Sequence, residues 1–78
     1  MSKEILSPLP GTFYRKPAPD KPVFKSEGDI VMVGEIVGLV EVMKSFIEVH
    51  ADVGGKIVRF LIDNEDPVMA GQPLLEVE

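Results

Sequence analysis

Hydrophobic residues occur along the chain in short runs that glycine and proline residues separate. No long stretch free of both residue types carries an apolar stripe of helical period. Residues 36–42 are instead rich in β-branched side chains. Residues 46–51 alternate in their second half, with Ile47, Val49 and Ala51 on one face. This pattern predicts an all-β fold.

Met43 and Lys44 lie between these two predicted strands. A two-residue connection between antiparallel strands is a tight hairpin, so the pattern places Lys44 at or beside the tip. The sequence neighbours of Lys44 include Val42, Met43 and Phe46 and no counter-charge. An amine on a rigid turn is accessible to a modifying enzyme. A solvated surface lysine without a function is the more common case for such a residue.

The sequence also contains an internal repeat. Identical residues recur in seven places: Asp29, Met32, Gly34 and Glu41 recur 37 positions later, and Glu4, Gly11 and Arg15 recur 44 positions later. Halves of about forty residues cannot bury an apolar face alone, so we expect them to close on each other about a quasi-two-fold axis. The expected product is a flattened eight-stranded barrel-sandwich that occupies residues 1–78 as one domain.

The two offsets differ by seven, so the first half carries about seven extra residues between Arg15 and Phe24. This insert spans residues 16–22 and contains Pro17, Pro19 and Pro22. Prolines lack a backbone donor, so the insert cannot be a central strand. We expect it to project as a short polyproline-like arm, with an ordinary surface loop as the alternative.

Composition excludes several classes of function. Thirteen acidic and eight basic residues give a formal net charge of −5, which repels nucleic acid and anionic lipid headgroups. Glu35 and Glu41 interrupt the longest apolar stretch well short of the ~20 residues of a membrane span. No signal peptide opens the chain, so we expect a protein without a membrane or nucleic-acid partner. The absence of cysteine excludes disulfides and thiolate sites.

No catalytic or metal site is predicted. His50, the single histidine, has no nucleophile motif around it and is interpreted as a partly exposed cross-strand residue. Residues 63–66 form an acidic stretch without the ligand spacing of a calcium loop, which indicates a solvated turn. Gly34, Gly54, Gly55 and Gly71 are interpreted as turn residues that need positive φ.

Two motifs carry a resemblance to a known family. Glu41-Val42-Met43-Lys44-Ser45 resembles the biotin attachment site of biotinyl domains, whose usual pattern is Glu-Ala-Met-Lys-Met with the lysine modified. Residues 11–15, with residues 17–20 after them, resemble the start of the "thumb" of the biotin carboxyl carrier proteins of acetyl-CoA carboxylase. The resemblance runs from about residue 7 to residue 78.

The resemblance implies a flattened eight-stranded barrel whose modified lysine lies on a hairpin opposite the termini. It implies that biotin protein ligase joins biotin to Lys44 through an amide. The implied ligase-recognition residues are Glu41, Val42, Met43 and Ser45. The implied thumb, which reaches toward biotin, consists of Arg15, Lys16, Pro17, Ala18, Pro19, Asp20, Lys21 and Pro22. We expect this segment, which has a local charge of +2, to fold over the biotin ring.

The implied function is that of a non-catalytic, cytoplasmic carrier. Biotin carboxylase loads the ring of biotin with ATP and bicarbonate, and a carboxyltransferase passes the carboxyl group to acetyl-CoA, which gives malonyl-CoA for fatty acid biosynthesis. The sequence departs from the family pattern at Val42, at Ser45 and at Lys16, where members often carry a small hydroxyl residue.

Other functions remain compatible with the residues. Carriers of other biotin-dependent carboxylases are similar. Lipoyl domains share the half-barrel repeat, but their lysine usually follows aspartate and they lack the thumb, so Met43 and the insert both disfavour lipoate. An unmodified interaction module is a third possibility. A hydrolase has little support because no nucleophile and base are present.

Overall fold

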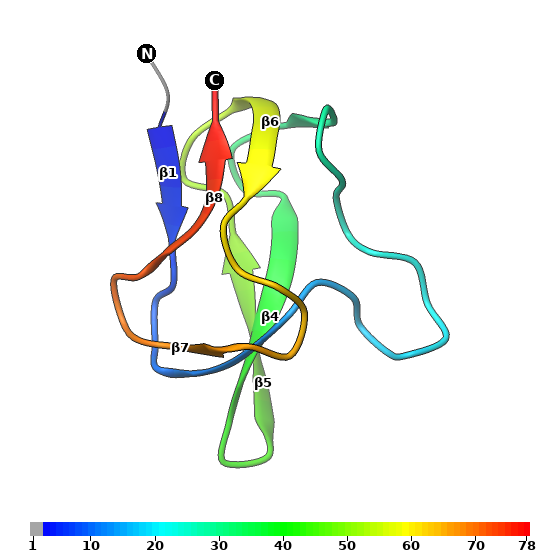
Figure 1. Ribbon diagram of the computed structural model, residues 1–78, viewed down its shortest axis with the longest axis vertical. Helices are drawn as coiled ribbons and strands as arrows, with labels where there is room; N and C mark the ends of the chain where they lie inside the picture. Colours follow the sequence, from blue (N-terminus) through cyan, green and yellow to red (C-terminus); the bar gives the residue numbers. More distant parts are fainter. Residues whose placement is uncertain (1–2) are drawn as a thin grey trace.

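Eight short strands, arranged in two four-stranded antiparallel sheets, make up the computed structural model, which describes residues 3–78 (Figure 1). The strands are β1 (Lys3–Leu6), β2 (Gly11–Tyr14), β3 (Ile30–Val31), β4 (Ile36–Val42), β5 (Ser45–His50), β6 (Gly55–Phe60), β7 (Pro67–Val68) and β8 (Pro73–Val77). The molecule measures 35 × 27 × 20 Å, so it is flattened as predicted. The all-β prediction is confirmed.

The order of strands in the two sheets shows the quasi-two-fold symmetry. One sheet has the order β1-β8-β6-β3 and the other has the order β5-β4-β2-β7. The repeat relates β1 to β5, β2 to β6, β3 to β7 and β4 to β8, and this exchange converts one order into the other. The halves predicted from the sequence repeat are therefore equivalent in three dimensions.

Equivalent backbone hydrogen bonds recur in the two halves. The Gly34 amide donates to Ala51 O at 2.7 Å, and at the equivalent position the Gly71 amide donates to Ser7 O at 2.8 Å. Both glycines have positive φ, 95° and 83°, as the sequence predicts. Gly55 also has positive φ, 148°, but the prediction is wrong for Gly54, which does not. The register of β4 on β5 and that of β8 on β1 shift at equivalent positions too. The backbone scaffold of the first half is thus repeated in the second.

The core lies between the two sheets. Its residues are fully buried side chains from both halves: Ile5, Phe13, Val31, Val37, Val40, Val49, Ala51, Ile57, Val68, Leu74, Leu75 and Val77. The large ring of Phe13 is accommodated because Gly38 lies beside it. A Cβ on Gly38 would be 2.5 Å from Phe13 Cε1.

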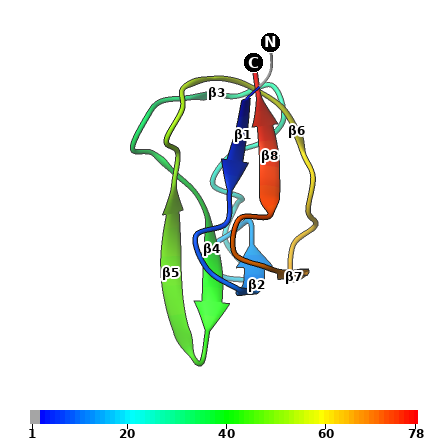
Figure 2. The ribbon, with the colours of Figure 1, turned by 90° about the vertical axis from the view of Figure 1, so that its left-hand side faces the viewer.

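The β4–β5 hairpin and the chain termini lie at opposite ends of the molecule (Figure 2). Val40 pairs with Ile47 inside the hairpin, and the equivalent pair, Val77 with Lys3, joins β8 to β1. In the repeat, the turn that joins β4 to β5 therefore corresponds to the gap between the end of β8 and the start of β1. The described part of the chain contains no helix that could span a membrane.

Candidate functional site

The connection between β4 and β5 is a two-residue turn. Val42 pairs with Ser45, which leaves Met43 and Lys44 as the central residues, with φ of 48° and 71°. Positive φ at both central positions is the geometry of a type I′ turn, whose twist matches that of the flanking strands. The turn forms although neither residue is glycine or asparagine, so the long pairing of β4 with β5 determines its geometry.

Lys44 lies at the tip of this turn, as the pattern predicts, and its side chain is exposed. No hydrogen bond or ion pair within residues 3–78 involves its amine. The Met43 side chain beside it is 93% exposed, which is unusual for a large apolar residue. The turn therefore presents an unpaired amine and an apolar side chain together.

The other residues of the attachment motif differ in their surroundings. Ser45 is exposed, whereas Val42 is half-buried and packs against the core. Glu41 is also half-buried, and its Oε1 accepts a hydrogen bond from the Tyr14 hydroxyl at 3.1 Å. Only Met43, Lys44 and Ser45 are thus fully available to a partner at the tip.

The proline-rich insert belongs to the long connection between β2 and β3, which stands out from the side of the barrel (Figure 1). Its base is closed by a hydrogen bond of 2.9 Å from the Phe24 amide to Arg15 O. A second hydrogen bond, from the Lys21 amide to Ala18 O, makes a turn at its outer end. The insert is therefore an ordered arm with a fixed base.

Arg15 fixes this base to the barrel. Its guanidinium lies 4.0 Å from the centre of the Phe60 ring, and its Nη2 donates to Lys25 O. Its backbone amide donates to Asn64 Oδ1 at 2.7 Å. Arg15, the first residue of the predicted thumb, therefore holds the base of the arm on Phe60 and Asn64. The charges beyond the base come from Lys16, Asp20 and Lys21.

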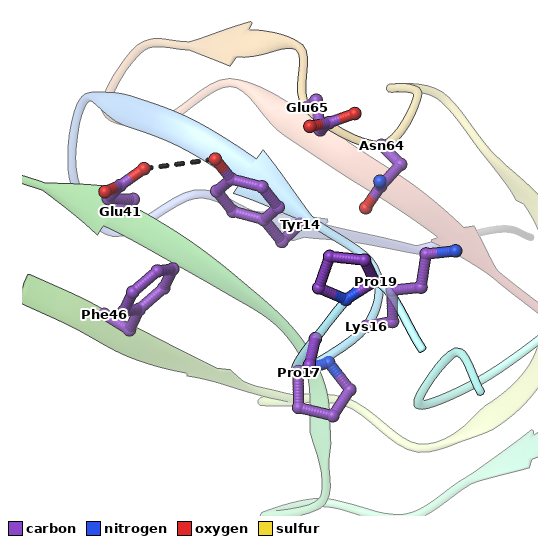
Figure 3. A pocket seen from close by; sticks show the side chains of 9 residues that line it. Tyr14, Lys16, Pro17, Pro19, Glu41, Phe46, Asn64 and Glu65 are labelled. Atoms are coloured by element: carbon purple, nitrogen blue, oxygen red, sulfur yellow. Dashed lines mark hydrogen bonds between the residues drawn. The ribbon is translucent and has the colours of Figure 1, made fainter. Parts of the chain in front are cut away.

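A pocket of about 390 Å³ lies between the arm and the sheet (Figure 3). Its lining residues come from four parts of the chain: Tyr14, Lys16, Pro17, Ala18, Pro19, Glu41, Phe46, Asn64 and Glu65. The Tyr14 and Phe46 rings are tilted against each other with centroids 5.8 Å apart. Prolines and aromatic rings thus form apolar walls, and Glu41 and Glu65 supply charge at the edges.

The electrostatic state of Tyr14 reflects these carboxylates. The hydrogen bond to Glu41 raises the pKa of the Tyr14 hydroxyl above its usual 10.0. Loss of hydration and the negative charges of Glu41 and Glu65 act in the same direction. The hydroxyl therefore remains a hydrogen-bond donor at neutral pH.

His50 does not line the pocket, and of the acidic stretch only Asn64 and Glu65 do. His50 is exposed, with Nδ1 2.8 Å from Gly34 O and Nε2 3.3 Å from Glu48 Oε1. Asp66 and Asp63 form a closed turn, in which the Asp66 amide donates to Asp63 O and Asp66 Oδ2 accepts from the Asp63 amide. No cluster of metal-ligating side chains occurs within the described residues.

Sequence reasoning did not identify the pocket residues Tyr14, Phe46, Asn64 and Glu65. One signal was present in the repeat. Glu65 stands 37 positions after Gly28, and both have positive φ, 71° and 91°. A glutamate at the equivalent of a positive-φ glycine points to a position with a special role.

Comparisons with known proteins show the family of the chain. The family model described as "Biotin-requiring enzyme" matches residues 3–77. The biotin carboxyl carrier proteins of acetyl-CoA carboxylase from Nostoc sp. and Chlamydia pneumoniae are 43% and 49% identical over 75 and 73 residues, or 96% and 94% of this chain. This chain spans only 41% and 44% of those relatives.

A solved structure contains the same fold. The urea carboxylase of Kluyveromyces lactis contains a region with a TM-score of 0.79 and 28% sequence identity, covering 100% of this chain and 6% of the carboxylase. The family match extends over nearly the whole described chain and includes both halves of the repeat. The chain therefore belongs to the biotin/lipoyl attachment family of biotin-requiring enzymes.

Proposed function

We propose that this chain is the biotin carrier domain of an acetyl-CoA carboxylase and that Lys44 Nζ carries biotin through an amide bond. The observation that carries the proposal is the exposed, unpaired Lys44 amine on a type I′ turn. The names of the relatives at 43% and 49% identity support acetyl-CoA as the final acceptor.

The residues present fit biotin. An amide bond needs an amine that is free of ion pairs, and Lys44 offers one. The bicyclic ring of biotin has apolar edges and a ureido group with N–H donors, and the pocket offers both the Tyr14 and Phe46 rings and carboxylate acceptors. When bound, biotin supplies a ring nitrogen that accepts and releases a carboxyl group.

The arm and the turn act together in this proposal. Residues 15–22 are the thumb, and its Pro17 and Pro19 side chains, which line the pocket with Tyr14 (Figure 3), would cover the biotin ring there. The thumb excludes water from part of the ring and returns it to one place between transfers. Lys44 stands at the end of the same hairpin that contributes Phe46 to the pocket wall.

The proposed partners are biotin protein ligase, biotin carboxylase and carboxyltransferase. For the ligase, the proposed recognition residues are Glu41, Val42, Met43 and Ser45. The exposed Met43 and Ser45 side chains support direct contact, while Val42 and Glu41 hold the strand that ends in the turn.

The carrier itself contributes tethering and no catalytic group. A covalently held ring meets each partner active site at a raised effective concentration and does not diffuse away between them. Amide formation removes the Lys44 charge and changes the net charge from −5 to −6, so the proposal includes no nucleic-acid or membrane partner. A cytoplasmic location stays a prediction.

The proposal is tested by coexpression with an active biotin protein ligase, followed by peptide mass spectrometry. We expect one biotin per chain on Lys44, none in Lys44→Arg, and unchanged labelling in Lys56→Arg, which alters an exposed strand lysine. Lipoyl addition, or biotin on another lysine, would refute the proposal.

A thumb deletion tests the role of the arm. Removing residues 16–22 should leave folding and biotin attachment intact, because the equivalent connection between β6 and β7 folds without such an insert. Carboxyl transfer between the two partner enzymes should change, since the pocket loses Lys16 and its proline wall. Unfolding of the deleted protein, seen by circular dichroism, would make the thumb a structural element instead.

A carrier domain of another biotin-dependent carboxylase is the second candidate, favoured by the urea carboxylase match at a TM-score of 0.79. Copurification of the biotinylated chain with its native partners, followed by assays with acetyl-CoA and urea as acceptors, separates the two. Carboxylation of urea alone would favour the second candidate.

A further inference from the structure

Glu65 adopts a backbone conformation that favours glycine. Its amide donates to Phe13 O at 2.6 Å, and in the other half the Gly28 amide donates to Ile57 O at 2.8 Å. The two residues are equivalent in the repeat and have φ of 71° and 91°. A side chain at such φ costs conformational free energy, so the glutamate stands at a position where glycine would be less strained.

The Glu65 side chain lines the pocket beneath the thumb, on the opposite side of the Tyr14 ring from Glu41 (Figure 3). Tyr14 donates its hydroxyl hydrogen to Glu41, but within residues 3–78 no hydrogen bond or ion pair involves the Glu65 carboxylate. The charge of Glu65 is nevertheless felt in the pocket, because it contributes to the raised pKa of Tyr14.

The pocket lining has an excess of negative charge. Glu41 and Glu65 are its acidic members and Lys16 is its one basic member. Figure 3 shows the Lys16 ammonium directed away from Tyr14 and Glu41. An anion in the pocket beside the Tyr14 ring therefore meets a repulsive field, whereas a neutral group with N–H donors meets an unused acceptor.

Carboxylation changes both the charge of the biotin ring and its number of N–H donors. Carboxylation replaces the hydrogen on one ureido nitrogen with a carboxylate, so the ring loses an N–H donor and gains a negative charge. A carboxylate in the pocket accepts a hydrogen bond from the unloaded ring and repels the loaded one.

We propose that Glu65 makes the pocket selective for the unloaded ring, so that the ring lies under the thumb before carboxylation and leaves the pocket once it carries the carboxyl group. This inference rests on the proposed function, because it needs biotin on Lys44. Its physical consequence is that the loaded ring is free to reach the carboxyltransferase, while the unloaded ring returns to one defined place.

The test uses the biotinylated chain with 13C-labelled aromatic rings, and mass spectrometry first establishes that Lys44 carries biotin. NMR shifts of the Tyr14 and Phe46 rings are compared in the unmodified, biotinylated and loaded protein. Loading uses catalytic biotin carboxylase, ATP and 13C-bicarbonate, and the 13C carboxyl signal measures the loaded fraction.

In the wild-type protein, biotin should shift both ring signals, and loading should move them back toward the unmodified positions. Glu65→Gln is isosteric and neutral, so it removes the repulsion between residue 65 and the loaded ring. The ratio of loaded rings inside the pocket to those outside should rise roughly threefold, which is the factor for two unit charges about 6 Å apart in water. Asp63→Asn is the matched control, since Asp63 is an exposed carboxylate in the same loop that does not line the pocket.

Two outcomes overturn this inference alone. One is a wild-type protein whose ring signals do not respond to biotin or remain shifted after loading. The other is a Glu65→Gln protein that responds to loading as the wild-type and Asp63→Asn proteins do. A protein without biotin on Lys44 would instead overturn the proposed function, and this inference with it.

Discussion

The connection between β2 and β3 and its equivalent between β6 and β7 end with equivalent hydrogen bonds, from the Gly28 amide to Ile57 O and from the Glu65 amide to Phe13 O, but only the first carries an arm. The insert is confined to residues 16–22, and the repeat resumes in register after it. The first half therefore accepts a local addition while the strand order of the two sheets stays equivalent. The arm, the Lys44 turn and Glu65 all lie where the halves differ.

The two ends of the barrel also differ, although the strands that meet there are equivalent. At one end, Met43 and Lys44 connect β4 to β5, and at the other end the equivalent strands β8 and β1 are paired without a connection between them. Pairing alone keeps β8 on β1, so the turn is not required to hold β4 on β5. The turn residues are therefore free to serve a partner.

The largest difference within the core is the pair Phe13 and Gly38, whose equivalents are Ile57 and Leu75. A large residue faces a small one in the first half, and two medium residues replace them in the second. Gly38→Ala places a Cβ 2.5 Å from Phe13 Cε1 and 2.9 Å from Tyr14 O. We expect a loss of about 3 kcal/mol in the free energy of unfolding, measured by urea denaturation.

Gly54→Ala is the matched control, because the nearest atom to its added Cβ, Val31 O, is 3.3 Å away. Its cost should be clearly smaller. Adding Phe13→Leu to Gly38→Ala should recover part of the loss, since the ring contact is removed while the contact with Tyr14 O remains. A Gly38→Ala protein as stable as Gly54→Ala would contradict the packing argument.

The next comparison uses the equivalent positions Gly28 and Glu65. Gly28→Ala adds a Cβ that meets no atom within 4 Å, so the cost is backbone strain alone, about 1 kcal/mol. Glu65→Gly should stabilise the fold by about 0.5 kcal/mol, because relief of that strain exceeds the added entropy of the unfolded chain. Urea midpoints measured at a constant m-value give both changes.

Each substitution is the control for the other, because Gly28→Ala adds a side chain and Glu65→Gly removes one at equivalent positions of the repeat. Changes of opposite sign are the expected result. If both variants were destabilised, the Glu65 side chain would stabilise the native state and would not be retained for the pocket.

The sequence predicted the two-sheet scaffold well, because residues that recur in the repeat make equivalent backbone hydrogen bonds in both halves. Gly34 and Gly71, 37 positions apart, need the same φ for the same bond. The Lys44 hairpin was also predictable, because strand alternation on both sides fixes the length of the connection. These features depend on neighbours in sequence or on a fixed offset.

The pocket was not predictable in the same way. Tyr14, Phe46 and Glu65 come from distant segments, and only the pairing of the strands brings them together. The contacts of Arg15 were not predictable for a similar reason. Its charge indicated a role in the arm, but the Phe60 ring on which it lies is 45 positions away along the chain.

The smallest difference with a measurable effect is His50, whose equivalent in the other half is Leu6. The hydrogen bond with Gly34 O raises the pKa of His50 above 6.5, and Glu48 adds to this shift, while loss of hydration opposes it. The protonated ring donates from Nδ1 to the turn and from Nε2 to Glu48. Only the first half therefore carries a pH-dependent contact at this position.

The sign follows from linkage. A pKa raised in the folded state contributes stability that is fully present below 6.5 and is lost as the pH rises through the raised value. Melting temperatures from about pH 5.5 to about pH 8 should fall more steeply for the wild-type protein than for His50→Leu, which installs the equivalent residue. Because other groups titrate in both proteins alike, the difference between the two curves isolates His50, and parallel curves would show that the histidine contact with Gly34 contributes nothing to the fold.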